Sequence, residues 1–248
     1  MNDLLQKRNA LSGASRKKHV PRGTTRRRLA QSFAVLSLSA GLATPAVAAV
    51  GPFAFVADGA VRIIDLRSNQ TFPNMEAFDT VAAFVLNKAG TKLYELYSAD
   101  GGVGVRDIAT NKYGSPIIAK GGLSVIAPYT GGGMALTPDE AYLLVATGSE
   151  LDVISVDTGT IVKRIDKTLN VINPMDVKIA PSGQQAYVSD LCGGLAVISL
   201  TNWSVVKTID LAPGYLNTYR VTNKCQTAVR PTALDVNPSS SMAYVLDV

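Results

Sequence analysis

The sequence predicts an all-β protein, chiefly because one pattern of short strands recurs along it. The segment "APSGQQAYVSDLCGGLAVISL", residues 180–200, contains a turn, an apolar strand, a small-residue turn and a second strand. Similar segments occupy residues 51–66, 87–108 and 137–156, and residues 237–248 repeat the first half of the pattern. Equivalent positions lie about 42 to 48 residues apart, a period typical of β-propeller blades.

The strands of one whole unit can be assigned from the fourth repeat. Apolar runs rich in Val, Ile, Leu and Tyr, bounded by Gly, Pro, Asp, Asn and Ser, are typical of buried strands. They predict strands over residues 175–180, 185–190, 195–200 and 204–209. No stretch of residues 49–248 shows sustained helical periodicity. Each unit is therefore expected to form one four-stranded antiparallel blade.

The repeats in residues 49–248 make up about four and a half blades, because second strands occur once more often than the others. An open wheel leaves strand edges unpaired, which favours aggregation. We therefore expect a fragment of a larger wheel, with a closed four- or five-bladed wheel as the alternative.

The pattern "AYVSD", "LAVISL" and "VVKTID", preceded by the turn "APSG", resembles the blade repeat of the YVTN-type, lactonase-like bacterial β-propellers. The resemblance covers most of residues 51–248 and implies a propeller fold more than a reaction. Two features depart from the family pattern. The first unit lacks its opening strand, and "ELYSAD" replaces the usual small, polar end of the second strand.

Residues 1–48 resemble an export leader. A basic segment ending in "RRRLAQS" precedes an apolar run of about 18 residues, and Ala46 and Ala48 offer small side chains for signal cleavage. The motif "TRRRL", residues 25–29, is a partial twin-arginine match, and ordinary Sec export fits as well. Cleavage predicts a periplasmic or secreted bacterial protein with no stable membrane span, and an uncleaved anchor is the alternative.

Charge excludes a nucleic-acid role for the domain. The chain has 24 Lys and Arg and 19 Asp and Glu, for a net charge of +5. Nine of the basic residues fall in residues 1–48, so the remaining chain holds 15 basic and 18 acidic side chains. A mildly acidic domain lacks the cationic surface that phosphate binding requires.

The chain has two cysteines, Cys192 and Cys225, and an exported domain meets oxidising conditions. Both belong to connections that should emerge on the same face of a propeller, so we predict a disulfide, with two unpaired thiols as the alternative. Cys225 lies in an insertion over residues 212–230. This insertion is the predicted binding loop, and its candidate contact residues are Tyr215, Tyr219, Arg220 and Lys224. A ligand-free connection between blades is the alternative.

Catalytic chemistry is limited by what the domain lacks. The single histidine, His19, lies in the leader, which excludes Ser-His-Asp and Cys-His mechanisms. Four carboxylates predicted to follow second strands remain as candidate ligands for Ca²⁺: Asp58, Asp100, Asp190 and Asp247. The alternative is that these residues simply form turns. Apart from this possible Ca²⁺, no cofactor is predicted.

Two further patterns are interpreted as structural. Asp157, Thr158 and Gly159 spell the aspartic-protease triplet, but they fall in a predicted turn between two strands. Four tyrosines recur in the second strands and are expected to occupy one blade position as packing residues: Tyr94, Tyr142, Tyr187 and Tyr244.

The leading function hypothesis is an exported, non-catalytic propeller that acts as a binding or assembly scaffold for a protein or glycan of the cell envelope. A metal-dependent, lactonase-like hydrolase is the alternative, motivated by the recurring Asp residues and the family resemblance.

Overall fold

The computed structural model describes residues 53–57, 61–71, 80–98, 101–118, 122–123, 132–169, 171–211, 231–239 and 242–247. The predicted export leader lies outside these residues, including the candidate cleavage positions Ala46 and Ala48. The strands are β1 Phe53–Ala57, β2 Val61–Asp65, β3 Gln70–Thr71, β4 Val81–Leu86, β5 Lys92–Tyr97, β6 Val103–Asp107, β7 Lys112–Tyr113, β8 Met134–Leu136, β9 Tyr142–Ala146, β10 Leu151–Ser155, β11 Thr160–Ile165, β12 Pro174–Ile179, β13 Gln185–Asp190, β14 Gly194–Ser199, β15 Ser204–Asp210, β16 Pro231–Val236 and β17 Ala243–Asp247. A short 3-10 helix spans Lys167–Leu169.

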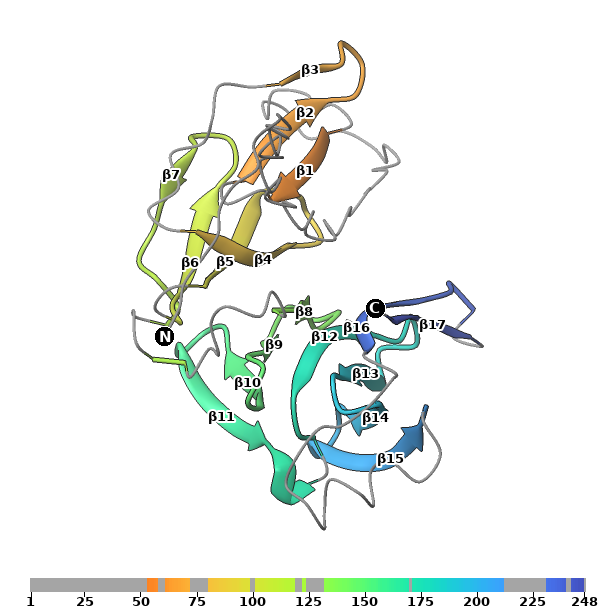
Figure 1. Ribbon diagram of the computed structural model, residues 1–248. Coiled ribbons are helices and arrows are strands. Elements are labelled where there is room, and N and C mark those ends of the chain that lie inside the picture. The colour runs from red at the N-terminus through yellow and green to blue at the C-terminus, as the bar shows by residue number, and fades with distance from the viewer. Residues whose placement is uncertain are drawn as a thin grey trace, which may run out of the picture. The chain divides into compact units, whose positions relative to one another are not determined.

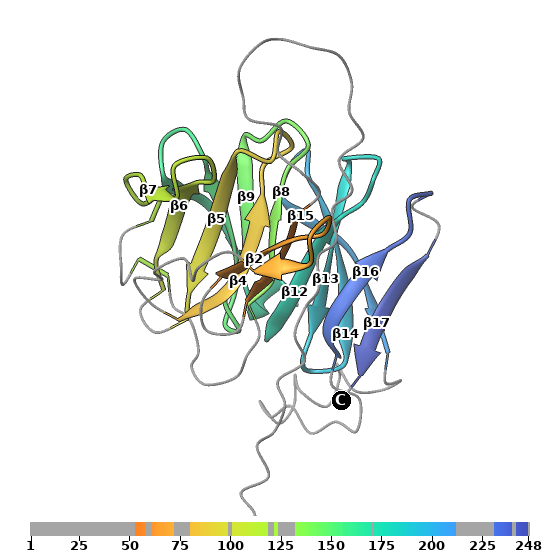
Figure 2. The same ribbon diagram turned by 90° about the horizontal axis from the view of Figure 1, so that it is seen from above.

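The strands form antiparallel sheets of sequential strands, labelled in Figure 1. Strands β4 to β7, β8 to β11 and β12 to β15 each make a four-stranded sheet, while β1 to β3 make a three-stranded sheet and β16 and β17 a pair. Figure 2 shows β12, β13 and β14 side by side in one twisted sheet. The predicted blades, and the four strands assigned to the fourth repeat, are confirmed.

The turn before the last strand has the same design in the four sheets that end with β3, β7, β11 and β15. The residue that ends the strand before this turn accepts a hydrogen bond from the turn backbone: Asp65 Oδ1 from Arg67, Asp107 Oδ1 from Thr110, Ser155 Oγ from Thr158 and Ser199 Oγ from Thr201. Four residues later the backbone has a positive φ, at Asn69, Asn111, Gly159 and Trp203. Gly159 therefore supplies a left-handed turn residue, as the turn interpretation of Asp157-Thr158-Gly159 predicts.

The cores lie between consecutive sheets. Leu143 and Val145 of β9 cluster with Tyr94 and Leu96 of β5, whereas Leu144 of β9 clusters with the sheet of β12 to β15. Alternate residues of one strand thus pack on the sheets before and after it, as the two-residue period of a strand requires. In each sheet, the face of the second strand that packs on the following sheet is called the forward face.

The tyrosine row includes one misassigned member. The hairpin bonds from Asn87 N–H to Lys92 and from Thr137 N–H to Tyr142 are equivalent, which places Leu144, two residues after Tyr142, at the position of Tyr94. Tyr142 instead packs edge-on against Trp203, with ring centroids 5.0 Å apart. The hairpin turn has the same length in the fourth repeat, where Ala180 N–H donates to the Gln185 carbonyl, so Tyr142 takes the position of Gln185, two residues before that of Tyr187.

Among the described residues, the structure contains no helix with the length and apolar character needed to span a membrane.

Candidate functional site

Asp190, a predicted calcium ligand, ends β13 and organises the chain around it. Its carboxylate accepts hydrogen bonds from the backbone N–H groups of Ile172 at 2.6 Å, Cys192 at 2.8 Å and Asn173 at 3.2 Å. The side chain is buried, and this burial raises the pKa of Asp190, while the three N–H donors act to lower it. Asp190 therefore fixes the connection into β12 and the turn after β13.

The turn held by Asp190 also supports the predicted binding loop. Leu211, which directly follows β15, donates its N–H to the Gly193 carbonyl at 2.9 Å, and the insertion begins at the next residue. It returns at Pro231, the first residue of β16, which contacts β12. We call residues 190–193, together with Leu211 and Pro231, the rim site. The insertion itself lies outside the described residues, including Tyr215, Tyr219, Arg220, Lys224 and Cys225.

Cys192 lies in the rim site and is completely buried. No free cysteine occurs among the described residues. Because its predicted partner, Cys225, lies outside them, the Cys192–Cys225 bridge stays a prediction.

Of the four predicted calcium ligands, Asp190 is the one whose side chain the structure describes. Asp58 and Asp100 lie outside the described residues, and Asp247 is described there only as the last residue of β17. In the second sheet, Tyr97 pairs with Val81 just as Asp190 pairs with Pro174, so Tyr97, not Asp100, is the equivalent of Asp190. The described residues contain no group of three or more metal-ligating side chains. The calcium site stays a prediction.

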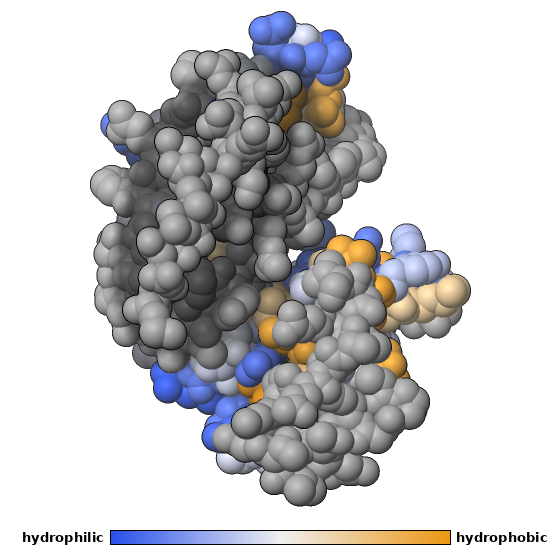
Figure 3. Space-filling model, in the orientation of Figure 1, coloured by the Kyte–Doolittle hydropathy of each residue, from blue (hydrophilic) through white to orange (hydrophobic). Residues whose placement is uncertain are grey.

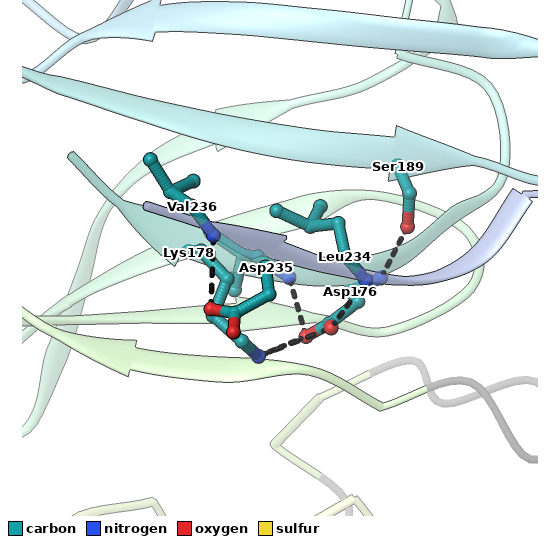
Figure 4. A network of polar contacts seen from close by, with 7 residues as sticks. Asp176, Lys178, Ser189, Leu234, Asp235 and Val236 are labelled. Atoms are coloured by element: carbon teal, nitrogen blue, oxygen red, sulfur yellow. Dashed lines mark hydrogen bonds and ion pairs between the residues drawn. The ribbon is translucent and has the colours of Figure 1, made fainter. Parts of the chain in front are cut away.

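A second polar cluster, which the sequence did not reveal, joins the innermost strands (Figure 4). The Asp176 carboxylate of β12 accepts hydrogen bonds from Lys178 Nζ at 2.9 Å and 3.0 Å and from Leu234 N–H of β16 at 3.0 Å. The Ser189 hydroxyl accepts the Asp176 N–H at 3.1 Å. Ala83, Gly133 and Ala233 occupy the equivalent positions in the other sheets, so this contact is particular to β12.

Gly133 shows how closely the innermost strands approach at Asp176. Its N–H donates to the Met175 carbonyl at 3.0 Å. A Cβ at Gly133 would come within 2.4 Å of the Asp176 Cα, so only glycine fits there. The cluster therefore fixes β16, and with it the return of the insertion, relative to the preceding sheets.

The third sheet carries a buried carboxylate that sequence reasoning also missed. Asp152 of β10 is completely buried, and neither carboxylate oxygen accepts a hydrogen bond from the described residues. The Arg164 Nε lies 3.4 Å from its Oδ1, while Glu150 pairs with the same guanidinium at 3.6 Å. Burial, followed by repulsion from Glu150, raises the pKa of Asp152 to about 7, against the opposing effect of Arg164. The charged form of Asp152 is costly because the carboxylate is buried and receives no hydrogen bond from the described residues.

Comparisons with known proteins agree with a propeller. Residues 43–80 match the model of the LVIVD repeat. A search of curated proteins finds no match to the chain.

Two solved structures show the same fold at low sequence identity. Hydrazine synthase of Kuenenia stuttgartiensis aligns with a TM-score of 0.59 and 17% identity, over 79% of this chain and 52% of the other. The Cps50 (Swd1) β-propeller domain of Myceliophteria thermophila aligns with a TM-score of 0.57 and 14% identity, over 79% of this chain and 58% of the other. The chain thus spans little more than half the length of these structures.

Proposed function

We propose that this chain is an exported, non-catalytic β-propeller scaffold that binds a protein or glycan of the bacterial cell envelope through the insertion at the rim site. The observation that carries the proposal is the rigid seating of both ends of the insertion, by Leu211 on the Gly193 turn and by β16 on β12. A binding segment whose ends are held by a rigid scaffold loses less conformational entropy when it binds a partner. Export rests on the basic and apolar pattern of residues 1–48.

The scaffold proposal also fits the chemistry of the domain. Its residues after position 48 include no histidine, and the Asp190 oxygens already accept three backbone hydrogen bonds. The resemblance of the blade pattern to the YVTN-type propellers supports a bacterial propeller. Aromatic and cationic side chains in the insertion, such as Tyr215 and Arg220, are suited to contacts with protein or sugar surfaces.

Affinity capture tests the proposal. The full chain, immobilised and exposed to a bacterial envelope extract, is expected to retain one component saturably. Excess free chain should compete for that component, because the free and the immobilised chains carry the same binding site. Failure to retain any saturable component from extracts of the native host would contradict the scaffold function.

The lactonase-like hydrolase makes a different prediction. It requires Ca²⁺, or another divalent cation, to raise the melting temperature of the chain, and it requires Asp190→Ala to abolish that rise. We expect no such rise, because coordination by Asp190 would compete with three backbone donors in a buried position. A calcium-dependent rise that is lost in Asp190→Ala would favour the hydrolase.

A further inference from the structure

A tryptophan occupies a strained backbone position in the turn between β14 and β15. Trp203 has a φ of 55°, in the left-handed region, where the same turn of three other sheets holds Asn69, Asn111 and Gly159. Asn and Gly tolerate this region, whereas a bulky side chain there is an outlier. Backbone strain of this kind is concentrated at functional positions. Trp203 is also the only tryptophan of the chain.

The strained turn lies beside Tyr142 of the third sheet. Tyr142 is on the forward face of β9, two residues before Leu144, and packs with Trp203 against the core between the third and fourth sheets. Their ring planes cross at 69°, so neither ring covers the other face to face. Both residues are half-buried. A Cβ at Gly183 would lie 3.0 Å from Pro138 Cγ, so the turns of the two sheets touch here. The pair therefore combines a rigid setting with aromatic surface that stays exposed.

Neutral polar groups adjoin the aromatic pair. Asn202 precedes Trp203, and its Oδ1 accepts a hydrogen bond from the Ser204 hydroxyl at 2.7 Å, while its amide nitrogen donates to none of the described residues. Gln184 is exposed in the turn before β13, and its carbonyl accepts the Leu200 N–H at 2.9 Å. That bond holds the two turns together, so both amide side chains belong to turns beside the indole.

The two turns that carry these amides are uncharged. Residues 179–187 and 199–206 contain no Asp, Glu, Lys, Arg or His. The carboxylates of the turn before β9 are engaged elsewhere, Asp139 within its own turn and Glu140 with a backbone N–H of the second sheet. The basic residues in the strands of the third sheet lie on its outer strand β11, where Figure 3 shows hydrophilic surface. An uncharged ligand therefore fits this setting better than an anion or a cation.

We propose that Trp203, Tyr142, Asn202 and Gln184 form a binding site for a neutral oligosaccharide, the aromatic site. The C–H face of a pyranose ring is apolar and weakly positive, so it is attracted to the negative face of an aromatic ring. Sugar hydroxyls both donate and accept hydrogen bonds, and so do the amide side chains of Asn and Gln. The aromatic rings supply the contact area, and the amides orient the sugar.

The aromatic site and the rim site lie at opposite ends of the fourth sheet. Gln185 of β13 pairs with Ser199 of β14 at the end that carries the aromatic site. Asp190 pairs with Gly194 at the end that carries the rim site. Sugar binding at the aromatic site is therefore a second activity, separate from binding through the insertion.

Tryptophan fluorescence of the full chain tests the proposal, because all of its tryptophan emission comes from Trp203. The probes are cellotetraose and chitotetraose, neutral chains of pyranose rings with equatorial substituents. We expect a saturable change in emission with at least one probe, half-complete at about 0.1 to 1 mM. Tyr142→Ala, which keeps the tryptophan, should weaken binding at least about fivefold through loss of an aromatic contact. The matched control is Tyr187→Ala, another half-buried tyrosine, on the opposite face of the fourth sheet from Ala186 and Val188, and it should bind as wild type.

Calorimetric titration of Trp203→Asn gives a second test. Asparagine already holds this turn position in two other sheets, so the variant should keep the fold, which circular dichroism checks, and lose measurable sugar binding. Tetragalacturonate, an acidic chain of the same length, should not bind the wild-type chain. The proposal is overturned if neither neutral probe changes the emission at about 10 mM, well above the expected half-saturation. Wild-type affinity in Trp203→Asn, equal affinities of Tyr142→Ala and Tyr187→Ala, or equal binding of tetragalacturonate would also overturn it.

Discussion

Arg106→Ala is expected to destabilise the protein by about 3 to 5 kcal/mol, the cost of leaving a buried charge without its partner. Arg106 Nε donates to Glu95 Oε1 at 2.9 Å, and the side chains are 1% and 0% exposed. Arg106 Nη1 donates to Asn111 Oδ1 at 2.9 Å, and the Arg106 guanidinium also stacks over the Tyr113 ring. Loss of the cation leaves the Glu95 carboxylate buried in the second sheet without its ion-pair partner.

The measurement is urea unfolding of Arg106→Ala beside wild type. The matched control is Glu95→Leu/Arg106→Met, which removes both charges and should recover most of the lost stability. The Tyr113 hydroxyl donates to Glu95 Oε2 at 2.6 Å, so some loss should remain in the double variant. If Arg106→Ala and the double variant are equally unstable, packing rather than charge pairing is what Arg106 contributes.

Asp152→Asn is expected to remove a fall in stability that wild type shows as pH rises from about 4 to about 7. The folded pKa of Asp152 is raised to about 7 from an ordinary value of 3.8, so the folded state holds the proton more tightly than the unfolded state. The stabilisation is complete below pH 4 and is lost as pH rises through 7. Three pKa units correspond to about 4 kcal/mol at most.

The measurement is the free energy of unfolding between pH 4 and pH 8 for both chains. Asp190 has a pKa shifted in the same direction, whereas Asp65, Asp107, Asp139 and Asp166 have lowered pKa values. All five are common to both chains, so the difference between the two curves isolates Asp152. Arg164→Gln is the companion variant and should steepen the wild-type fall, since Arg164 opposes the rise in the Asp152 pKa. Parallel curves for wild type and Asp152→Asn would refute this explanation.

The strands and turns could be predicted from the sequence because each depends on local pattern. Apolar runs set the strand positions, and the residues at Asp65, Asp107, Ser155 and Ser199 recur where the third strand ends and accepts a turn N–H. The spacing of about 42 to 48 residues between equivalent positions then predicted a four-stranded unit. Tyr142 was misplaced because the pair Ala141-Tyr142 looks like Ala186-Tyr187, although it lies two residues nearer the start of a hairpin turn of the same length.

The buried polar contacts could not be predicted because they join residues far apart in the chain. Asp176 meets the Leu234 N–H across 58 positions, and Asp190 meets Ile172 through a backbone group that has no sequence signature. For Glu95, the sequence did give a signal: "ELYSAD" departs from the repeat where a charged residue enters a buried strand. Arg106, eleven positions later, supplies the buried partner.

Saturation binding of the captured envelope component, measured on the full chain and on one loop variant, tests the central claim most directly. The variant replaces Tyr215, Tyr219, Arg220 and Lys224 with alanine. Its matched control, Lys163→Ala/Lys207→Ala, removes exposed charges from the outer strands β11 and β15.

We predict at least a roughly tenfold loss of affinity in the loop variant, equivalent to about 1.4 kcal/mol, and wild-type affinity in the control. Equal affinity of the loop variant and wild type would show that the insertion at the rim site is not the binding surface. That result would contradict the proposed function.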